Sequence, residues 1–474
     1  MSNLSPIHDY AAALEFLLGR IDYERAPTIP YQERHLKLDR MRDLLERLGN
    51  PHFGMPVVHI AGSKGKGSTA TFVSSITSAN GYRTGLYTSP HFQVVQERLR
   101  IDGLPCSEEE FVELTQYAVP AIKAMDACDD APTFFEIITA LAFVHFRRQQ
   151  VDLAVLEVGL GGRLDSTNVC EPLVTIITSI SFDHTRQLGN TLRSIAYEKA
   201  GIIKPNISVI SGVRQGEARD EIERVARERG APVITLGEDM EVVYHWRANG
   251  SGGESPTEAG PAGTMASSAT NVASLTYVRR DHPGERLDWP LSMPGEHQAA
   301  NAALALAAVD VLAEQGWQFC EESTREGLGS SRCPGRIEIV SRDPLVILDT
   351  AHNPASIRAL LDVIRTSCHP ARRVIVFGTT RGKDSAAMLA ILATECDHLI
   401  LTQYRNNPRS HPPDDLAMIV GELESQQMTR CTYEVIQSCE SAWERARAMA
   451  SDQDLICVTG SFFLAAELEG LVRG

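Results

Sequence analysis

The sequence lacks the features that would place it in a membrane or on a nucleic acid. It contains no run of about 18 apolar residues, and residues 1–13 have no basic stretch followed by an apolar one. The formal net charge is −16, so the field of the whole chain repels phosphate backbones and anionic lipids. We therefore expect a cytoplasmic protein with no nucleic-acid or membrane partner, in which any anionic ligand meets a local positive site.

Paired cysteine motifs are also absent. The ten cysteines are scattered, none forms a Cys-x-x-Cys pair, and the two closest in sequence are Cys431 and Cys439. A chain of this size does not need disulfides to hold its core together. We expect reduced thiols in the core or at the surface.

Length and alternating patterns favour two α/β domains. The chain has 474 residues, more than a single hydrophobic core usually holds, and shows no internal repeat of fixed period. Short β-branched runs alternate with helical stretches, which predicts mostly parallel sheets covered by helices. The clearest strands of the first part are residues 57–61, 153–158, 174–179 and 232–236. Those of the second part are residues 346–349, 373–378, 398–402 and 454–460.

Two interruptions suggest how these patterns are divided between domains. Residues 249–271 are rich in Gly, Ser, Ala, Pro and Thr, a composition that cannot bury enough apolar surface to fold alone. After an alanine-rich helix expected at 298–314, Pro334 and Gly335 break the pattern. We expect a first domain at 1–331 with a flexible insertion at 249–271, a hinge at 332–336, and a smaller Rossmann-like domain at 337–474.

Residues 62–69 form the strongest local motif. They read Gly-Ser-Lys-Gly-Lys-Gly-Ser-Thr, directly follow the strand at 57–61, and open a helix. The backbone N–H groups of such a loop close around phosphate oxygens, and the helix N-terminus adds partial positive charge. Lys66 would reach the β- and γ-phosphates and Ser68 would face magnesium. The sequence therefore predicts a nucleotide-binding phosphate loop made of Gly62, Gly65, Lys66, Gly67, Ser68 and Thr69.

Two further clusters lie at predicted strand ends, where open α/β sheets bind ligands. Glu157 leads into a glycine-rich segment, and its carboxylate is a candidate magnesium ligand because that ion prefers hard oxygen donors. The glycines alone would favour a structural turn. Asp183-His184-Thr185 follows another strand, with Lys199 a few turns beyond. Alone, His184 would be a structural histidine and Lys199 a solvated lysine; beside a phosphate loop, a ligand-binding role is equally consistent.

Together these motifs resemble those of folylpolyglutamate and dihydrofolate synthases, which belong to the Mur-ligase superfamily. The shared segments, in the family's order, are residues 62–69, 87–91 with Glu97-Arg98, 156–168, 183–185, 199–202 and 349–354. The resemblance extends from Ile21-Asp22-Tyr23 to Thr459-Gly460-Ser461, nearly the whole chain. It implies an α/β fold with a phosphate-loop Mur-ligase-like domain of mostly parallel sheet, followed by a smaller Rossmann-like glutamate-ligase domain.

The resemblance also implies roles for single residues. Ser89, Glu157 and His184 match the family's magnesium ligands, and Lys199 matches a lysine that is carbamylated there and can hold a second ion. Residues expected to hold the nucleotide's base, phosphates and ribose are Asn301, Arg336 and Asp349. Thr133 and Asp165 match positions that contact the pteroate-like substrate, and His352 lies where the incoming glutamate is expected. Lys66, Lys199 and His352 are the expected catalytic residues.

The implied reaction is ATP-dependent glutamate ligation. Transfer of the γ-phosphoryl group to the acceptor carboxylate gives an acyl phosphate that the glutamate amine attacks. The expected partners are ATP, two Mg²⁺ ions, L-glutamate, and dihydropteroate or a folate; the motifs do not separate these acceptors. We expect a monomer, because the family's cleft is built within one chain.

The sequence departs from the family's pattern in the phosphate loop, which usually reads Gly-Thr-Asn-Gly-Lys-Gly. Here Ser63 and Lys64 replace Thr and Asn. The added charge of Lys64 could tighten ATP binding or slow product release, and the sequence does not decide between them. The insertion at 249–271 and Arg186-Gln187 are further departures.

Two other classes of protein share part of this pattern. A cell-wall Mur ligase has the same chemistry but carries a UDP-binding domain first, for which the segment before the phosphate loop is too short. A regulatory or non-catalytic phosphate-loop protein would need only the loop and one magnesium carboxylate. It would not require Ser89, His184 and Lys199 as well.

Overall fold

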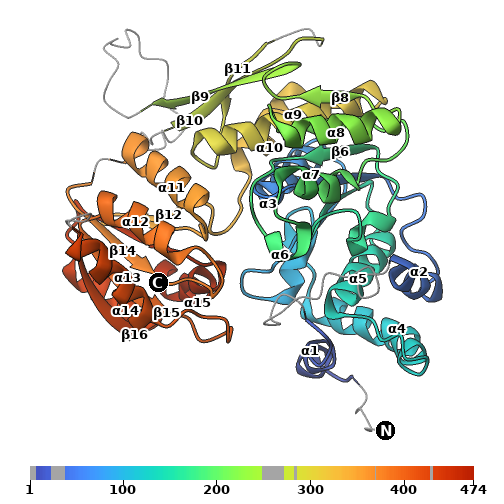
Figure 1. The fold of residues 1–474 in the computed structure, drawn as a ribbon. Coiled ribbons are helices and arrows are strands. Elements are labelled where there is room, and N and C mark those ends of the chain that lie inside the picture. Colours follow the sequence, from blue (N-terminus) through green and yellow to red (C-terminus); the bar gives the residue numbers. More distant parts are fainter. Residues whose placement is uncertain (1–6, 23–37, 248–271, 282–284, 369, 427–430) are drawn as a thin grey trace, which may run out of the picture.

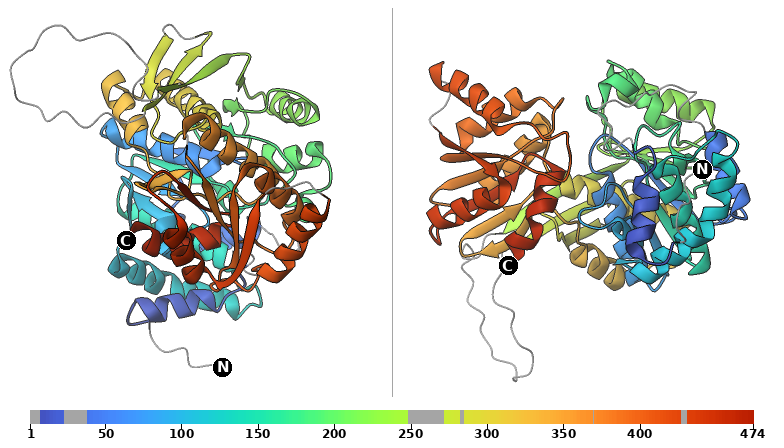
Figure 2. Two further views of the ribbon diagram at one scale, coloured as in Figure 1. Left: turned by 90° about the vertical axis from the view of Figure 1, so that its left-hand side faces the viewer. Right: turned by 90° about the horizontal axis from the view of Figure 1, so that it is seen from below.

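The computed structural model describes residues 7–22, 38–247, 272–281, 285–368, 370–426 and 431–474 (Figure 1). The predicted insertion at 249–271 lies outside these residues. Two α/β domains lie side by side, as Figure 1 and the right-hand view of Figure 2 show.

An eight-stranded sheet forms the centre of the larger domain. Its order is β4-β3-β2-β5-β1-β6-β7-β8, and the six strands from β2 to β8 in that order run parallel. At the other edge β3 and β4 run antiparallel to their neighbours. The strands are β1 (Val57–Ala61), β2 (Thr84–Tyr87), β3 (Leu99–Ile101), β4 (Leu104–Pro105), β5 (Leu153–Glu157), β6 (Val174–Ile177), β7 (Val209–Ser211) and β8 (Val233–Thr235).

Helices cover both faces of this sheet because the side chains of its strands alternate between two apolar cores. Val58 and Ile60 of β1 point to one core and Val57 to the other. The first core is covered by α3 (Lys66–Ala79), α9 (Glu296–Glu314) and α10 (Glu321–Ser330). The other face carries α1 (Tyr10–Leu18), α2 (Leu38–Arg47), α4 (Glu108–Asp126), α5 (Phe134–Arg148), α7 (Leu192–Ala200) and α8 (Glu217–Glu228). Short turns are η1 (Val95–Arg98), η2 (Ser166–Val169) and α6 (Thr185–Leu188).

A three-stranded antiparallel sheet that the sequence analysis did not predict packs on α9. Its order is β11-β10-β9, with β9 (Met240–Arg247), β10 (Val272–Arg279) and β11 (Glu285–Pro290). Leu275 and Trp289 are buried in the α9 core, and the Tyr277 hydroxyl donates to Asp310 of α9 at 2.9 Å. The sheet therefore extends the larger domain above the helix (Figure 1).

The smaller domain is built on a six-stranded sheet of order β12-β13-β17-β14-β15-β16. All its neighbours run parallel except β12 and β13. Its strands are β12 (Glu338–Arg342), β13 (Leu345–Leu348), β14 (Arg373–Phe377), β15 (His398–Gln403), β16 (Thr432–Ser438) and β17 (Leu455–Thr459). One face carries α11 (Pro354–Ser367), α12 (Ser385–Glu395) and α13 (Pro413–Ser425), and the other carries α14 (Cys439–Met449) and α15 (Phe462–Arg473).

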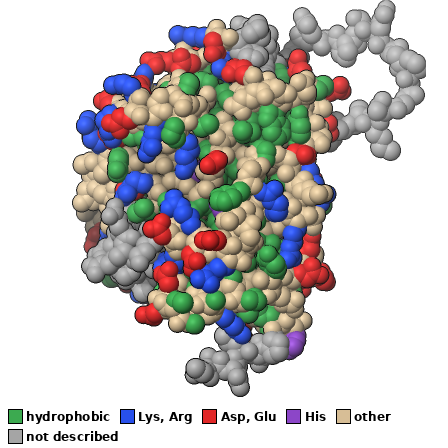
Figure 3. All heavy atoms as spheres, turned by 90° about the vertical axis from the view of Figure 1, so that its right-hand side faces the viewer, with side chains coloured by type: hydrophobic (Ala, Val, Ile, Leu, Met, Phe, Trp, Pro, Cys, Tyr) green, Lys and Arg blue, Asp and Glu red, His purple; other side chains and the backbone are tan. Residues whose placement is uncertain are grey.

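These two sheets confirm the predicted α/β class, while the domain boundaries at 331 and 337 stay predictions. In the described part of the chain, no helix is long and apolar enough to cross a membrane. All ten cysteines are free thiols, as expected. On the side of the larger domain that carries α2, α4 and α5, acidic and basic side chains are interspersed (Figure 3).

His59 makes the stability of this core depend on pH. It is fully buried in β1, with Nε2 2.8 Å from Thr167 Oγ1 and Nδ1 3.6 Å from Cys170 Sγ. Burial lowers its pKa to about 3, whereas an unfolded histidine titrates at about 6.5. Between these values the unfolded chain binds a proton here and the folded protein does not, so stability falls as pH falls. From pH 7 to 5, His59 should remove about 2 kcal/mol of the free energy of unfolding.

Urea unfolding at both pH values checks this prediction. In His59→Gln, which keeps a side-chain N–H donor but does not titrate, the loss between pH 7 and pH 5 should be smaller than in the wild type. The same loss in both proteins would contradict it.

Candidate active site

The carboxyl ends of both sheets open into one cavity of 490 Å³ between the domains. The larger domain contributes the ends of β1, β5 and β6 and the first turns of α9. The smaller domain contributes the end of β13 and the start of α11. Ligands of open α/β sheets bind at this edge, so the cavity is the candidate active site.

Hydrogen bonds to the exit of β6 hold the phosphate loop in place. The Ser63 amide donates to Ser179 O at 2.7 Å, and the Lys64 amide donates to Ser179 Oγ at 3.0 Å. Thr178 Oγ1 donates to Lys64 O at 2.6 Å. The loop then enters α3 at Gly65, whose φ of 84° is left-handed. Its remaining N–H groups stand at a helix N-terminus, the arrangement that binds phosphate.

Gly65 is required both by its backbone conformation and by the space around it. A Cβ atom at this position would lie 2.2 Å from Asn301 Oδ1, a predicted nucleotide contact. Gly65→Ala should therefore lose stability by about 1–2 kcal/mol for the left-handed backbone and, in addition, lose ATP binding.

A matched control separates these two effects. Gly81 also has a left-handed φ, of 85°, but a Cβ there would meet nothing within 4 Å. Gly81→Ala should lower the melting temperature to a similar extent while ATP binding, measured by calorimetry, stays intact. If both variants bind ATP equally well, the predicted role of Gly65 is wrong.

Lys66 and Glu157 face each other across the loop. Lys66 Nζ donates to Gly62 O at 3.2 Å and lies 4.0 Å from Glu157 Oε1. The Glu157 carboxylate is buried at the end of β5 and, among the described residues, accepts one hydrogen bond, from the Ser89 amide at 3.2 Å. Burial raises its pKa, and the Lys66 ammonium opposes that shift. A buried carboxylate with so few donors is suited to a cation.

Lys199 and His184, two further predicted metal ligands, also line the cavity. Lys199 Nζ donates to Gly62 O at 2.9 Å, and burial lowers its pKa to about 7. His184 begins α6 in a left-handed conformation, φ 51°, and burial lowers its pKa to about 4. Both groups thus lose their positive charge more readily than usual, as ligands of a cation must.

The glycine-rich segment after Glu157 has a packing role. A Cβ at Gly162 would come within 3.0 Å of the backbone carbonyls of Glu198 and Lys199, and the Arg163 amide donates to Glu198 O at 2.8 Å. The glycine allows this close approach. The segment therefore fixes the helix that carries Lys199 beside the strand that carries Glu157.

The predicted nucleotide residues of the second half also line the cavity. Asn301 Nδ2 donates to Gln298 Oε1 at 3.0 Å, and Arg336 donates to Thr350 Oγ1 at 2.7 Å. Asp349 accepts the Ile337 and Ala351 amides at 2.9 and 2.7 Å. It thereby shapes the chain where it enters the smaller domain.

His352 lies on the smaller domain's side of the cavity. Its Nδ1 is 2.9 Å from Thr350 O, so Nδ1 carries the proton and Nε2 is an acceptor, with Lys64 Nζ 2.9 Å away. Burial lowers its pKa well below the usual range, and the nearby Lys64 ammonium adds to this. The imidazole is therefore neutral and can accept a hydrogen bond at Nε2.

Three predicted ligand residues lie outside the cavity lining. Thr69 is fully buried, and its hydroxyl has no partner among the described residues. Thr133 caps α5, where its hydroxyl donates to Glu136 at 2.8 Å. Asp165 accepts the Leu160 amide at 2.9 Å and the Thr167 hydroxyl at 2.6 Å, which fixes the glycine-rich segment. Substrate contacts by Thr133 and Asp165 stay predictions.

Several residues of the site were not predicted from the sequence. His297 and Gln298 line the cavity from the start of α9, where Gly295 before the alanine-rich helix was the available signal. Lys383 follows β14 in the smaller domain and donates to Asp183 Oδ1 at 3.2 Å. Its position shortly after the predicted strand at 373–378 could have indicated that Lys383 belongs to the site.

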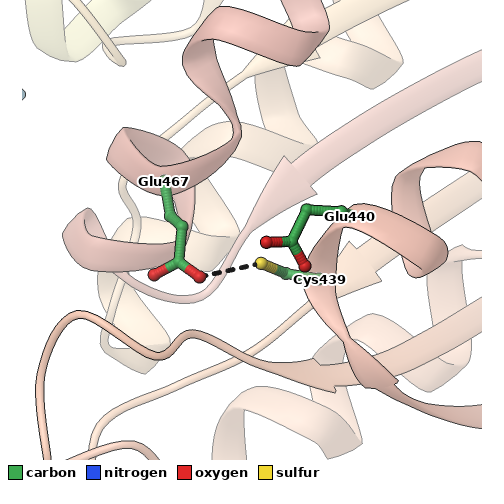
Figure 4. Close-up of side chains that lie close together, drawn as sticks. All are labelled: Cys439, Glu440 and Glu467. Atoms are coloured by element: carbon green, nitrogen blue, oxygen red, sulfur yellow. Dashed lines mark hydrogen bonds between the residues drawn. The ribbon is translucent and has the colours of Figure 1, made fainter.

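Elsewhere in the described residues, Cys439, Glu440 and Glu467 lie close enough together to hold a metal ion (Figure 4). The Cys439 thiol donates to Glu467 Oε1 at 3.2 Å, and burial and the adjacent carboxylates raise its pKa. Glu467 also accepts the Arg405 amide, and Glu440 pairs with the Arg405 guanidinium at 2.7 Å. These contacts already satisfy the carboxylates, so the cluster is structural.

The fold and site define a two-domain α/β protein with a nucleotide phosphate loop facing a shared cavity. Residues 60–309 match the Mur ligase middle domain, and residues 335–462 match the Mur ligase glutamate ligase domain. The chain belongs to the folylpolyglutamate synthase/dihydrofolate synthase family of Mur ligases.

Individual relatives support this assignment over nearly the full length. The dihydrofolate synthase/folylpolyglutamate synthase of Bacillus subtilis is 34% identical over 97% of this chain and 98% of its own. That of Escherichia coli is 32% identical over 91% of this chain and 90% of its own. The solved structure of E. coli FolC in complex with DHPP and ADP has a TM-score of 0.79 at 29% identity, covering 98% of both chains.

Proposed function

We propose that this protein is an ATP-dependent ligase that joins L-glutamate to dihydropteroate, to the glutamate tail of tetrahydrofolate, or to both. One observation carries the proposal beyond family membership. The phosphate loop of the larger domain and His352 of the smaller domain line the same cavity. A phosphoryl donor and an amine nucleophile can therefore meet one acceptor carboxylate.

The chemistry follows from the positions of these groups. An acceptor carboxylate is a poor electrophile, so the γ-phosphoryl group of ATP is transferred to its oxygen and ADP leaves. The glutamate amine then attacks the carbonyl carbon, the amide bond forms and phosphate departs. Lys66 and Arg336 stabilise the negative charge on the phosphoryl oxygens. His352, the predicted catalytic residue of the smaller domain, would contact the incoming glutamate, whose ammonium loses its proton to water before the amine attacks.

Magnesium fits the donor set around Glu157. The carboxylate is buried, accepts a hydrogen bond from the Ser89 amide and faces Gly67 of the loop, with Ser89 and His184 also in the cavity. These residues would hold the ion, which would neutralise phosphate charge when bound. Carbamylated Lys199 would add a carboxylate for a second ion; native mass spectrometry in bicarbonate buffer tests for the added carbon dioxide.

The test of function is ADP release with ATP, Mg²⁺ and glutamate, in the presence of dihydropteroate, tetrahydrofolate or no acceptor. Products are identified by mass. Glutamate-dependent turnover of dihydropteroate establishes dihydrofolate synthesis, and added glutamate units on tetrahydrofolate establish tail extension. If ATP binds but neither acceptor stimulates ADP release, the ligase proposal is wrong and a regulatory phosphate-loop protein is favoured.

We also propose that the chain acts as a monomer, because both walls of the cavity come from one chain. The cytoplasm is its proposed location. Light scattering of the purified protein tests the oligomeric state.

A further inference from the structure

Lys64, the residue that departs from the usual phosphate loop, does not turn toward the loop that carries it. Its Nζ donates to Asp183 Oδ2 at 2.7 Å and lies 2.9 Å from His352 Nε2. His352 belongs to the smaller domain, 288 positions further along the chain. Lys66, by contrast, stays on the loop through Gly62 O.

A second contact crosses the cleft at the same place. Lys383 of the smaller domain donates to Asp183 Oδ1 at 3.2 Å, so Asp183 accepts one lysine from each domain. Asp183 is therefore an anion that both domains share.

This cluster is shielded enough from water for its charges to matter. The side chains of Lys64 and Asp183 are 29% and 13% exposed, and that of Lys383 is 22% exposed. Pairs that are partly buried are screened by salt less than surface pairs. The contact also fixes the direction of the His352 hydrogen bond, because a protonated lysine can only donate and Nε2 can only accept.

We propose that Lys64 is a positioning residue that links the phosphate loop to the smaller domain and holds the two domains together across the cleft before nucleotide binds. Its ammonium acts on Asp183 and His352 and not primarily on the phosphates, which are left to Lys66 and the loop amides. The part of this proposal that concerns glutamate rests on the proposed function, since it requires His352 to serve the incoming amine.

The test compares the full-length wild type with Lys64→Asn, Lys64→Arg and Lys123→Asn. Asparagine removes the cation, whereas arginine keeps one that can reach both Asp183 and His352. Lys123 is an exposed lysine of α4 that does not line the cavity. Small-angle X-ray scattering without nucleotide measures how the domains are arranged. Calorimetry measures ATP binding, and steady-state kinetics measure kcat and the KM for glutamate.

Lys64→Asn should increase the radius of gyration of the nucleotide-free protein, and Lys64→Arg should restore the wild-type value. ATP affinity should change little in Lys64→Asn, while the KM for glutamate rises about tenfold, the factor that 1.4 kcal/mol produces. Lys123→Asn should match the wild type in every measurement.

The proposal is overturned if wild type and Lys64→Asn scatter identically, or if Lys64→Asn weakens ATP binding and leaves the KM for glutamate unchanged. Scattering needs no turnover. If the wild type shows no acceptor-dependent ADP release, the proposed function fails, while the scattering comparison still decides whether Lys64 holds the domains together.

Discussion

Replacing Lys66 with alanine is expected to lower kcat/KM for ATP by about 100- to 1,000-fold, because one preorganised positive donor to the transferred phosphoryl group is lost. Lys66 is the lysine of the phosphate loop that stays on the loop itself, at 3.2 Å from Gly62 O. Phosphoryl transfer depends mainly on positioning and charge neutralisation, so the loss of the Lys66 ammonium should slow the reaction directly. ADP release at varied ATP concentration measures the loss.

The control for Lys66→Ala is Lys123→Ala, on the exposed face of α4. It removes the same side chain outside the cavity and should leave kcat/KM unchanged. Circular dichroism and melting temperature should be close to wild type in both variants. A Lys66→Ala protein that keeps most of its kcat/KM would show that the loop does not bind the reacting phosphates.

Glu157→Gln is expected to cause a comparable loss, about 100-fold or more in kcat, with a much weaker response to added magnesium. Glutamine has nearly the same shape, but it cannot supply the anionic oxygen that a divalent cation prefers. Because Glu157 is buried and its pKa is raised, removing its charge should not lower the folded protein's stability. Magnesium titration of ADP release and a melting curve provide the two measurements.

Glu171→Gln is the matched control, since Glu171 is an exposed carboxylate outside the cavity lining. It should titrate with magnesium as the wild type does. If Glu157→Gln retains the wild-type magnesium dependence, the prediction that Glu157 is a metal ligand is wrong.

The parallel strands could be predicted because they are buried on both faces and form continuous apolar runs. The predicted strand at 57–61 coincides with β1, and that at 153–158 ends one residue earlier, at Glu157. The β9–β11 sheet was not predicted. Its period-two signal was present, since Val242, Tyr244 and Trp246 pack on the α9 core. These strands flank the low-complexity segment at 249–271, and the region was therefore interpreted as a flexible insertion.

The phosphate loop and Glu157 could be placed at one site from sequence because the ends of parallel strands meet at one sheet edge. The partners of Lys64 could not be predicted from the sequence. A lysine's charge shows that it will find an anion or a phosphate, but which one depends on domain packing between positions hundreds of residues apart. The internal use of the Asp165 carboxylate by Leu160 and Thr167 is likewise set by the local turn, which composition does not reveal.

The cavity shared by the two domains also governs how the molecule comes apart. A nucleotide that touches both walls contributes its full binding free energy only while both domains are folded. Without it, a two-domain chain need not melt in a single all-or-none transition. With it, loss of the smaller domain removes contacts that stabilise the larger one. The bound nucleotide therefore makes two separately built cores behave as one cooperative unit.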